Sequence, residues 1–276
     1  MKVALNRSKA PADSNEELQA QCDELADSEV PAAVLCAFCG DADCAGCRNE
    51  QTRSGVVAIV PWERPGAPAL TRLWATARAT TFDAERFFEA LPDGPITPAL
   101  RFAFASEMLA SASMALLALV PLSLVAPAWV EHVFLDERLA ATRLVAAGVP
   151  ALATILVAAH VAHGWALDRG ARRAGVRGAT ARAVRFGLYA AGWDVVVGPL
   201  GALVVAAKEG LGKAFSIAGI GVGLPGRSAR AFLRGCYRLE GAAAEPALRA
   251  SYVAAAVATG VGAVAVIAAL AAALLL

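Results

Sequence analysis

The sequence predicts an all-α integral membrane protein: a five-span helical bundle with a small N-terminal four-cysteine zinc-knuckle module and an interfacial amphipathic helix. Three observations support this prediction. Hydrophobic residues make up 58% of the 276 residues and charged residues only 18%, whereas soluble domains contain about 45–50% apolar residues. Several apolar runs reach the roughly 20 residues that are needed to cross a bilayer. Four cysteines cluster ahead of the first of these runs.

The N-terminal residues 1–30 are polar and acidic and show no apolar periodicity. Such a composition predicts a disordered segment. A secretory signal would need an apolar core in this position, so we expect no cleaved signal. The region before the first span is therefore predicted to stay in the cytoplasm.

Residues 31–55 contain Cys36, Cys39, Cys44 and Cys47 in a C-x2-C-x4-C-x2-C pattern. Two close pairs of thiolates can chelate one tetrahedral ion, and clustered cysteines in a reducing cytoplasm favour metal over disulfides. Four protein ligands close the coordination shell, so the pattern predicts structural zinc without a catalytic position. An iron–sulfur cluster, a redox pair and a metal-free segment remain alternatives.

Residues 56–101 form a predicted linker followed by amphipathic juxtamembrane helices. Apolar residues recur at spacings of three and four over residues 70–91 and indicate two helical pieces, broken near residues 80–82. Arginines among them suit a helix that lies in the membrane interface. The same apolar face could instead pack on the membrane bundle or on the cysteine module.

The membrane domain is predicted to comprise residues 102–276, and two positions compete for the turn between its third and fourth spans. A turn at 208–213 keeps Lys208, Glu209 and Lys213 at an interface and leaves Pro199 as a kink. A turn at 198–201 would bury these charges, so we favour the first position. The five predicted spans are residues 102–126, 144–167, 186–207, 211–224 and 252–276.

The charges between the spans predict the orientation. Segment 127–143 has two arginines and three carboxylates, whereas 168–185 has six arginines and one aspartate, and 225–249 has five arginines and two glutamates. The positive-inside bias places the two arginine-rich segments in the cytoplasm and the C-terminus on the opposite side.

The expected partners follow from this placement. The chain should contact the lipid bilayer, with anionic lipids at the arginine-rich inner loops. An unidentified cytoplasmic protein is a further expected partner, and self-association stays open. The net charge of only +1 and the lack of a basic face with interleaved aromatic residues argue against a nucleic-acid partner.

Four ionisable residues fall inside predicted spans, where polar groups are costly and often functional. His160 and His163 lie three residues apart on one helical face, and Glu107 and Asp194 belong to the first and third spans. Together they could form a metal or proton site. Alternatively, the histidines hydrogen-bond to the backbone or extend towards the interface. The hydrolase motifs H-E-x-x-H and G-x-S-x-G are missing.

Residues 59–66 (IVPWERPG) and 70–109 combine a Trp-containing helix, paired phenylalanines and a Gly/Pro turn ahead of the first span. This arrangement resembles the start of the membrane domain in Yip1-family proteins, and VAAHVAHGWAL and TARAVRFGLYAA are also similar. The resemblance covers roughly residues 59–265, although Lys208 to Lys213 depart from the pattern.

The Yip1 resemblance implies a five-span helical protein with a cytoplasmic N-terminal region. The cysteine module is similar to the zinc ribbon of prokaryotic members. Eukaryotic members are associated with Rab-type GTPases and vesicle traffic, but no binding residue carries over to this chain.

Two hypotheses for function follow. The first is a non-enzymatic membrane adaptor or organiser that recruits a cytoplasmic partner. The alternative is a small transporter or an intramembrane metal-dependent enzyme that uses the four ionisable residues of the spans. The alternative requires these side chains to converge, so ligand-capable atoms of three of them within about 5 Å would favour it.

Overall fold

A computed structural model describes residues 60–275 of the chain. The predicted disordered segment 1–30 and the four cysteines of the predicted zinc module lie outside the described residues. Residues 58–276 belong to one compact unit, and the following description concerns that unit alone.

The described residues are mostly helical and contain no strand, which confirms the predicted all-α class. In chain order the elements are η1 (Pro61–Glu63), α2 (Ala69–Phe82), α3 (Ala84–Glu89), α4 (Ile96–Val125), α5 (Pro127–Glu131), η2 (His132–Asp136), α6 (Arg138–Arg173), α7 (Thr180–Ala190), α8 (Gly192–Val196), α9 (Pro199–Glu209), α10 (Leu211–Phe232), η3 (Leu233–Tyr237), η4 (Gly241–Ala243) and α11 (Glu245–Leu275).

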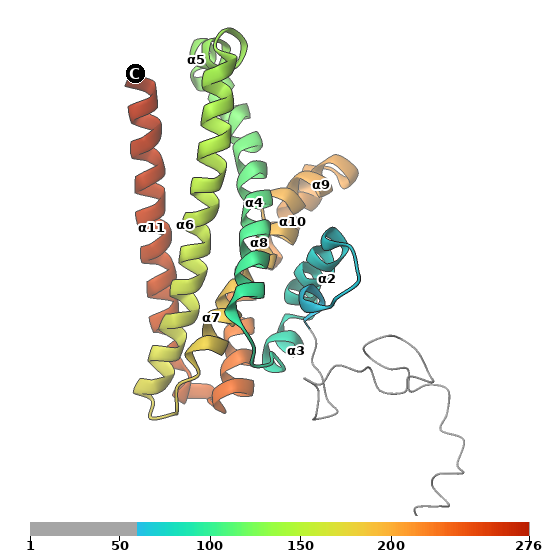
Figure 1. Ribbon diagram of the computed structural model, residues 1–276, viewed down its shortest axis with the longest axis vertical. Coiled ribbons are helices and arrows are strands. Elements are labelled where there is room, and N and C mark those ends of the chain that lie inside the picture. Colours follow the sequence, from blue (N-terminus) through green and yellow to red (C-terminus); the bar gives the residue numbers. More distant parts are fainter. Residues whose placement is uncertain (1–59, 276) are drawn as a thin grey trace, which may run out of the picture. The chain divides into compact units, whose positions relative to one another are not determined.

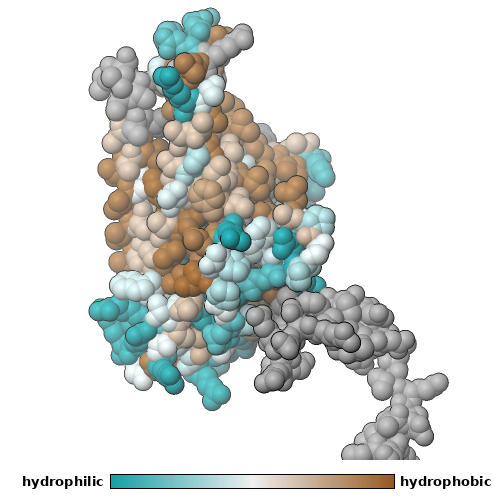
Figure 2. All heavy atoms as spheres, in the orientation of Figure 1, coloured by the Kyte–Doolittle hydropathy of each residue, from teal (hydrophilic) through white to brown (hydrophobic). Residues whose placement is uncertain are grey.

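Three long helices, α4, α6 and α11, run side by side, with α6 packed against both of the others (Figure 1). Their outward faces are apolar: Val120 on α4 and Val257 on α11 are each about 60% exposed. Figure 2 shows a largely hydrophobic surface over these helices, with hydrophilic residues gathered at both ends. A contiguous apolar surface of this kind is typical of a membrane-embedded bundle.

Among residues 60–275, four helical segments are long and apolar enough to cross a membrane. This finding indicates an integral membrane protein. The fourth predicted span, residues 211–224, forms the first part of α10 and is not one of these four segments. The four segments are Ile96–Val125, Ala141–Arg173, Thr180–Glu209 and Gly241–Ala268.

The third segment is broken twice, and the chain then turns back. Helix α8 is separated from α7 at Ala191 and from α9 at Val197 and Gly198. Pro199 is the first residue of α9, where a missing N–H costs nothing. The turn into α10 occurs at Gly210, whose φ of 88° suits glycine. The preferred turn at 208–213 and the break at Pro199 are therefore both confirmed.

Two helices extend beyond the apolar spans that the sequence predicts, one past residue 167 and the other ahead of residue 252. Helix α6 continues to Arg173 and α11 begins at Glu245. Hydropathy marks the apolar part of a helix, but alanine and arginine favour helix and let it continue beyond that part. The end of α6 is set instead by Gly175, which has a φ of 86°.

The two juxtamembrane helices occur as predicted, with the break at Asp83. Helix α2 buries one face, including Leu73 and Ala77, and packs on α8. The face is therefore engaged with the bundle. Leu70 and Trp74, in the first half of α2, are 76% and 47% exposed, which leaves them available to the membrane interface.

An aromatic core joins the juxtamembrane helices to the broken segment. The Phe186 ring on α7 lies 4.8 Å from that of Phe88 on α3 and 4.7 Å from that of Phe232 on α10. All three side chains are fully buried. Offset and edge-to-face pairs at these separations stabilise packing beyond burial alone, so this cluster holds α3, α7 and α10 together.

Candidate intramembrane cation site

Glu107, His160 and Asp194 converge from α4, α6 and α8. The Nε2 atom of His160 lies 3.0 Å from Oε1 of Glu107 and 3.1 Å from Oδ2 of Asp194. The ligand-capable atoms of the three residues all lie within 4.8 Å of one another. Three of the four ionisable residues named from the sequence are thus brought together, within the separation that favours the transporter or metal-site hypothesis.

The cluster has more close contacts between polar atoms than it has hydrogen atoms to donate to them. The Nε2 atom carries at most one hydrogen, yet it contacts a carboxylate oxygen on each side. The other oxygen of Glu107, Oε2, is buried and has no protein partner. One ring nitrogen thus serves two carboxylate oxygens, and an added proton or a bound cation would balance this arrangement.

Burial is graded across the cluster. The side chain of Glu107 is 0% exposed, that of His160 is 16% exposed and that of Asp194 is 41% exposed. Glu107 therefore forms the closed end and Asp194 the open end.

Small residues on α4 allow the neighbouring helices to reach Glu107. Ala103, Ser106, Ala110 and Ser111 are all buried around it. Side chains of this size let helix backbones approach closely in membranes. The sequence FASEMLASAS thus combines a buried carboxylate with space for α6 and α8.

A glycine contact positions His160. A Cβ atom on Gly187 of α7 would collide with the carbonyl oxygen of His160, and one on Gly164 of α6 would collide with the carbonyl oxygen of Ala183. The two backbones therefore touch on both sides of the crossing. Close packing of α6 against α7 fixes the position of His160 along the length of the bundle.

Helix α2 holds the short helix that carries Asp194. Trp193 Nε1 donates a hydrogen bond of 2.8 Å to the carbonyl oxygen of Thr80. This carbonyl lies in the last turn of α2, where carbonyls lack an intrahelical partner. A Cβ atom on Gly192 would collide with the Thr80 hydroxyl, so α2 and α8 are in direct contact beside the site.

His163 does not join the cluster. Its buried ring stacks on Phe186 at 5.7 Å between centroids and lies 6.3 Å from the ring of Tyr252. Residues three apart are about 60° apart around a helix, so His160 faces α4 and α8 while His163 faces α7 and α11. The expectation that the two histidines share a site is wrong for this reason.

The arginine-rich segment 168–185 contains ion pairs that the loop-charge argument did not predict. Arg185 is completely buried and its Nη2 donates to Glu63 Oε1 at 2.6 Å. The hydroxyl of Tyr189 donates to the same oxygen at 2.5 Å. Glu63 and Arg185 lie 122 positions apart in the sequence, so no local pattern could reveal this pair.

Asp168 forms a second buried centre at the same end of the bundle. Its carboxylate accepts hydrogen bonds from Arg172 at 2.9 Å, the Ala179 backbone N–H at 2.7 Å, Thr180 at 2.7 Å and Tyr237 at 2.6 Å. The spacing of four between Asp168 and Arg172 is a recognisable helical pair. The contacts from Thr180 and Tyr237 depend on the tertiary fold.

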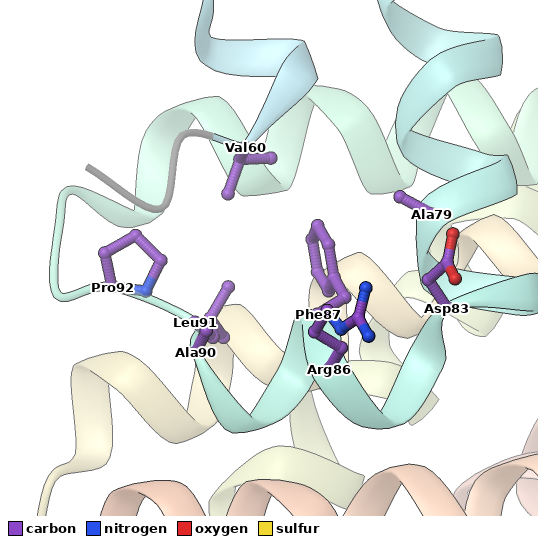
Figure 3. Close-up of a pocket in the computed structure, with 8 residues that line it drawn as sticks. All are labelled: Val60, Ala79, Asp83, Arg86, Phe87, Ala90, Leu91 and Pro92. Atoms are coloured by element: carbon purple, nitrogen blue, oxygen red, sulfur yellow. The ribbon is translucent and has the colours of Figure 1, made fainter. Parts of the chain in front are cut away.

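A pocket of about 380 Å³ lies away from the cluster, on the juxtamembrane region (Figure 3). Its walls are mainly apolar, with Asp83 and Arg86 as the only charged residues among those that line it. None of its lining residues belongs to the cation site. The full lining is Val60, Ala79, Asp83, Arg86, Phe87, Ala90, Leu91 and Pro92.

The fold and the site together indicate an integral membrane protein with a buried carboxylate–histidine–carboxylate cluster between three helices. Comparison with known protein families, with curated proteins and with solved structures finds no match to this chain. The function is therefore argued from the site itself.

Proposed function

We propose that this protein is a small membrane transporter that binds a cation at Glu107, His160 and Asp194. The observation that carries this proposal is the convergence of their three ligand-capable atoms within 4.8 Å. Ionisable groups inside membrane segments are costly and are usually paired with each other or with a transported ion. An unpartnered carboxylate oxygen at the closed end adds a place for that ion.

The broken third segment supports transport rather than catalysis. Discontinuous helices in transporters expose backbone groups beside the ion site and allow the two halves to move. Here Asp194 lies on the five-residue helix α8, between the breaks at Ala191 and Gly198. The partly exposed carboxylate is thus carried by a short helix that lies between two breaks in the third segment.

A flux assay tests the proposal. The full chain is reconstituted into vesicles that contain indicator dyes for protons, for Na⁺, for K⁺ and for divalent metals, and gradients of protons, Na⁺, K⁺ and Mn²⁺ are imposed in turn. We expect at least one cation to enter faster than into protein-free vesicles. Asp194→Asn should reduce that flux by about tenfold or more, because loss of a ligand-positioning contact has effects of this order.

The matched control is Asp136→Asn, an exposed aspartate of η2 outside the cluster. Its flux should equal that of the unchanged protein. If no cation enters faster than into vesicles with Asp194→Asn protein, the transport proposal is wrong.

The adaptor hypothesis remains a second proposal, because Leu70 and Trp74 on α2 present exposed apolar surface beside the bundle. In this proposal the chain is a Yip1-type adaptor, and structural zinc at Cys36, Cys39, Cys44 and Cys47 shapes a cytoplasmic module that recruits a partner. Zinc analysis of the purified full chain, with Cys36→Ser as the control, tests the metal. Absence of zinc from the unchanged protein would exclude this module.

The five-span topology is also a proposal. Its support is that α9 and α10 pack against each other across the turn at Gly210. In Figure 1 the C-terminal end of α11 lies at the end of the bundle that carries α5, away from α7. A reporter that is active only in the cytoplasm, fused after Leu276, should be inactive. Activity of this reporter would contradict five spans with a cytoplasmic N-terminus.

A further inference from the structure

We infer that the cluster of Glu107, His160 and Asp194 binds a divalent transition-metal ion of the Mn²⁺, Fe²⁺ or Zn²⁺ kind. This inference rests on the proposed function and names the class of cation. Three features of the site carry it: the balance of charge, the types of donor atom and the unpartnered oxygen of Glu107.

Charge balance favours a divalent ion. Metal ligands must be deprotonated, so two coordinating carboxylates and one coordinating imidazole together carry two negative charges. A divalent ion makes the site neutral, whereas a monovalent ion leaves one negative charge. An uncompensated charge is costly where solvent is excluded, and the Glu107 side chain is 0% exposed.

The donor atoms favour a transition metal over Mg²⁺ or Ca²⁺. Imidazole nitrogen suits Zn²⁺, Fe²⁺ and related ions, and carboxylate oxygen suits Mn²⁺ as well. Mg²⁺ and Ca²⁺ prefer sites built from oxygen alone. In this cluster His160 is central, because its Nε2 is the atom that contacts both carboxylates.

The two separations from His160 also fit coordination of one ion. Two ligands that bind at about 2.1 Å and at a right angle are about 3.0 Å apart. The distances from Nε2 to Oε1 of Glu107 and to Oδ2 of Asp194 are 3.0 and 3.1 Å. Hydrogen bonds have similar lengths, so these distances do not distinguish a hydrogen-bonded cluster from a metal site. Charge and donor type decide between them. The buried Oε2 of Glu107, which has no protein partner, provides a fourth donor atom.

Titration with Mn²⁺ tests the inference. Free aqueous Mn²⁺ is measured by electron paramagnetic resonance as the purified full chain is added in detergent. We expect one bound Mn²⁺ per chain, because thiolate sites select zinc and not manganese. Asp194→Asn and Glu107→Gln should each weaken binding by about tenfold or more.

His160→Gln provides a test of metal class. This substitution should weaken Mn²⁺ binding by about tenfold or more, because the imidazole is a ligand for the transition metal. Ca²⁺ is expected to compete only weakly for the site, and the substitution should leave that competition unchanged. The control is His132→Gln, which removes an exposed histidine that lies 3.7 Å from Asp136. This variant should bind Mn²⁺ as the unchanged protein does.

Folding of each variant is checked by thermal unfolding without metal. Asp194 is partly exposed, so Asp194→Asn is the variant expected to keep its unfolding temperature. Mn²⁺ binding that survives in this variant, or Ca²⁺ that competes as strongly as Zn²⁺, would overturn the inference. So would the lack of any binding below about 1 mM.

The flux assay separates this inference from the proposed function. If Asp194-dependent flux of protons or monovalent ions occurs but Mn²⁺ does not bind, the metal class is wrong and the transport proposal stands. If Mn²⁺ binds as expected but no cation crosses, the metal site stands and the transport proposal is wrong.

Discussion

Gly187 on α7 lies directly against the backbone carbonyl oxygen of His160 on α6, so a Cβ atom at position 187 would collide with that oxygen. The contact links the crossing of two helices to the central ligand of the cation site. Anything that separates α6 from α7 should also move His160 away from Glu107 or Asp194.

Gly187→Ala should therefore weaken both the fold and the site. Overpacking of a tight contact costs about 1–3 kcal/mol, and we expect a lower unfolding temperature together with weaker Mn²⁺ binding. Gly148→Ala on α6, the helix that carries His160, is the control, because no atom lies within 4 Å of its added Cβ. Unchanged Mn²⁺ binding by the Gly187 variant would show that the contact does not position His160.

Glu63→Ala should destabilise the attachment of η1 to α7. Arg185 is 0% exposed, and removal of one partner from a buried ion pair costs about 3–5 kcal/mol. The unfolding temperature of Glu63→Ala should therefore be lower than that of the unchanged protein. Glu63→Gln should unfold at an intermediate temperature, because its amide oxygen can still accept hydrogen bonds. Glu131→Ala on α5 removes an exposed glutamate and should change little. Equal unfolding temperatures for the alanine variants at 63 and 131 would contradict this account.

Low pH should loosen the contact between α3 and η3. Arg234 donates to both oxygens of Glu89, at 3.0 and 2.5 Å, and this hydrogen bonding lowers the pKa of Glu89 below its ordinary value of 4.5. A lowered pKa contributes stability that is present above pH 4.5 and is lost as the pH falls through the folded-state pKa.

The measurement is the unfolding temperature of the protein and of Glu89→Gln between about pH 6 and pH 3. The unfolding temperatures of the two proteins should differ at about pH 6 and converge towards about pH 3. The pair is partly exposed, so high salt should reduce the difference. Parallel curves at every pH would contradict a role for the charge.

Asp168→Asn should cost more than Tyr237→Phe. The carboxylate of Asp168 accepts four hydrogen bonds, whereas Tyr237 donates one of them. Burial and this hydrogen bond raise the pKa of Tyr237 above its usual range, so the phenol remains a donor. Each lost bond to a charged group costs about 1.5–3 kcal/mol. Chemical unfolding in mixed micelles measures the free energy of unfolding of both variants. A smaller loss for Asp168→Asn than for Tyr237→Phe would contradict the prediction.

The two arginine-rich segments contain both paired and exposed arginines, which the sequence could not separate. Arg185 and Arg234 are held by glutamates of η1 and α3. Arg169, Arg173 and Arg177 are exposed and stay the candidates for anionic lipid contacts. A count of loop charges treats all of them alike, because it contains no information on which side chains the fold buries.

The sequence alone determined the helical class and the apolar segments, and it predicted a kink at Pro199 and a turn within residues 208–213. The structure has a helix break before Pro199 and places the turn at Gly210. These features depend on composition, proline geometry and the cost of buried charge, all of which act over a few neighbouring residues. The sequence also identified Glu107, His160 and Asp194 as costly groups inside membrane segments. It could not show that they meet, since they lie 53 and 34 residues apart along the chain.

Only the tertiary structure decided which histidine belongs to the site. His160 and His163 have the same chemistry and similar neighbours, but a rotation of about 60° around α6 directs them to different helices. The packing of α6 against α7 through Gly164 and Gly187 sets that rotation. The site therefore depends on contacts between distant segments, and such contacts are not visible in the local pattern of any one of them.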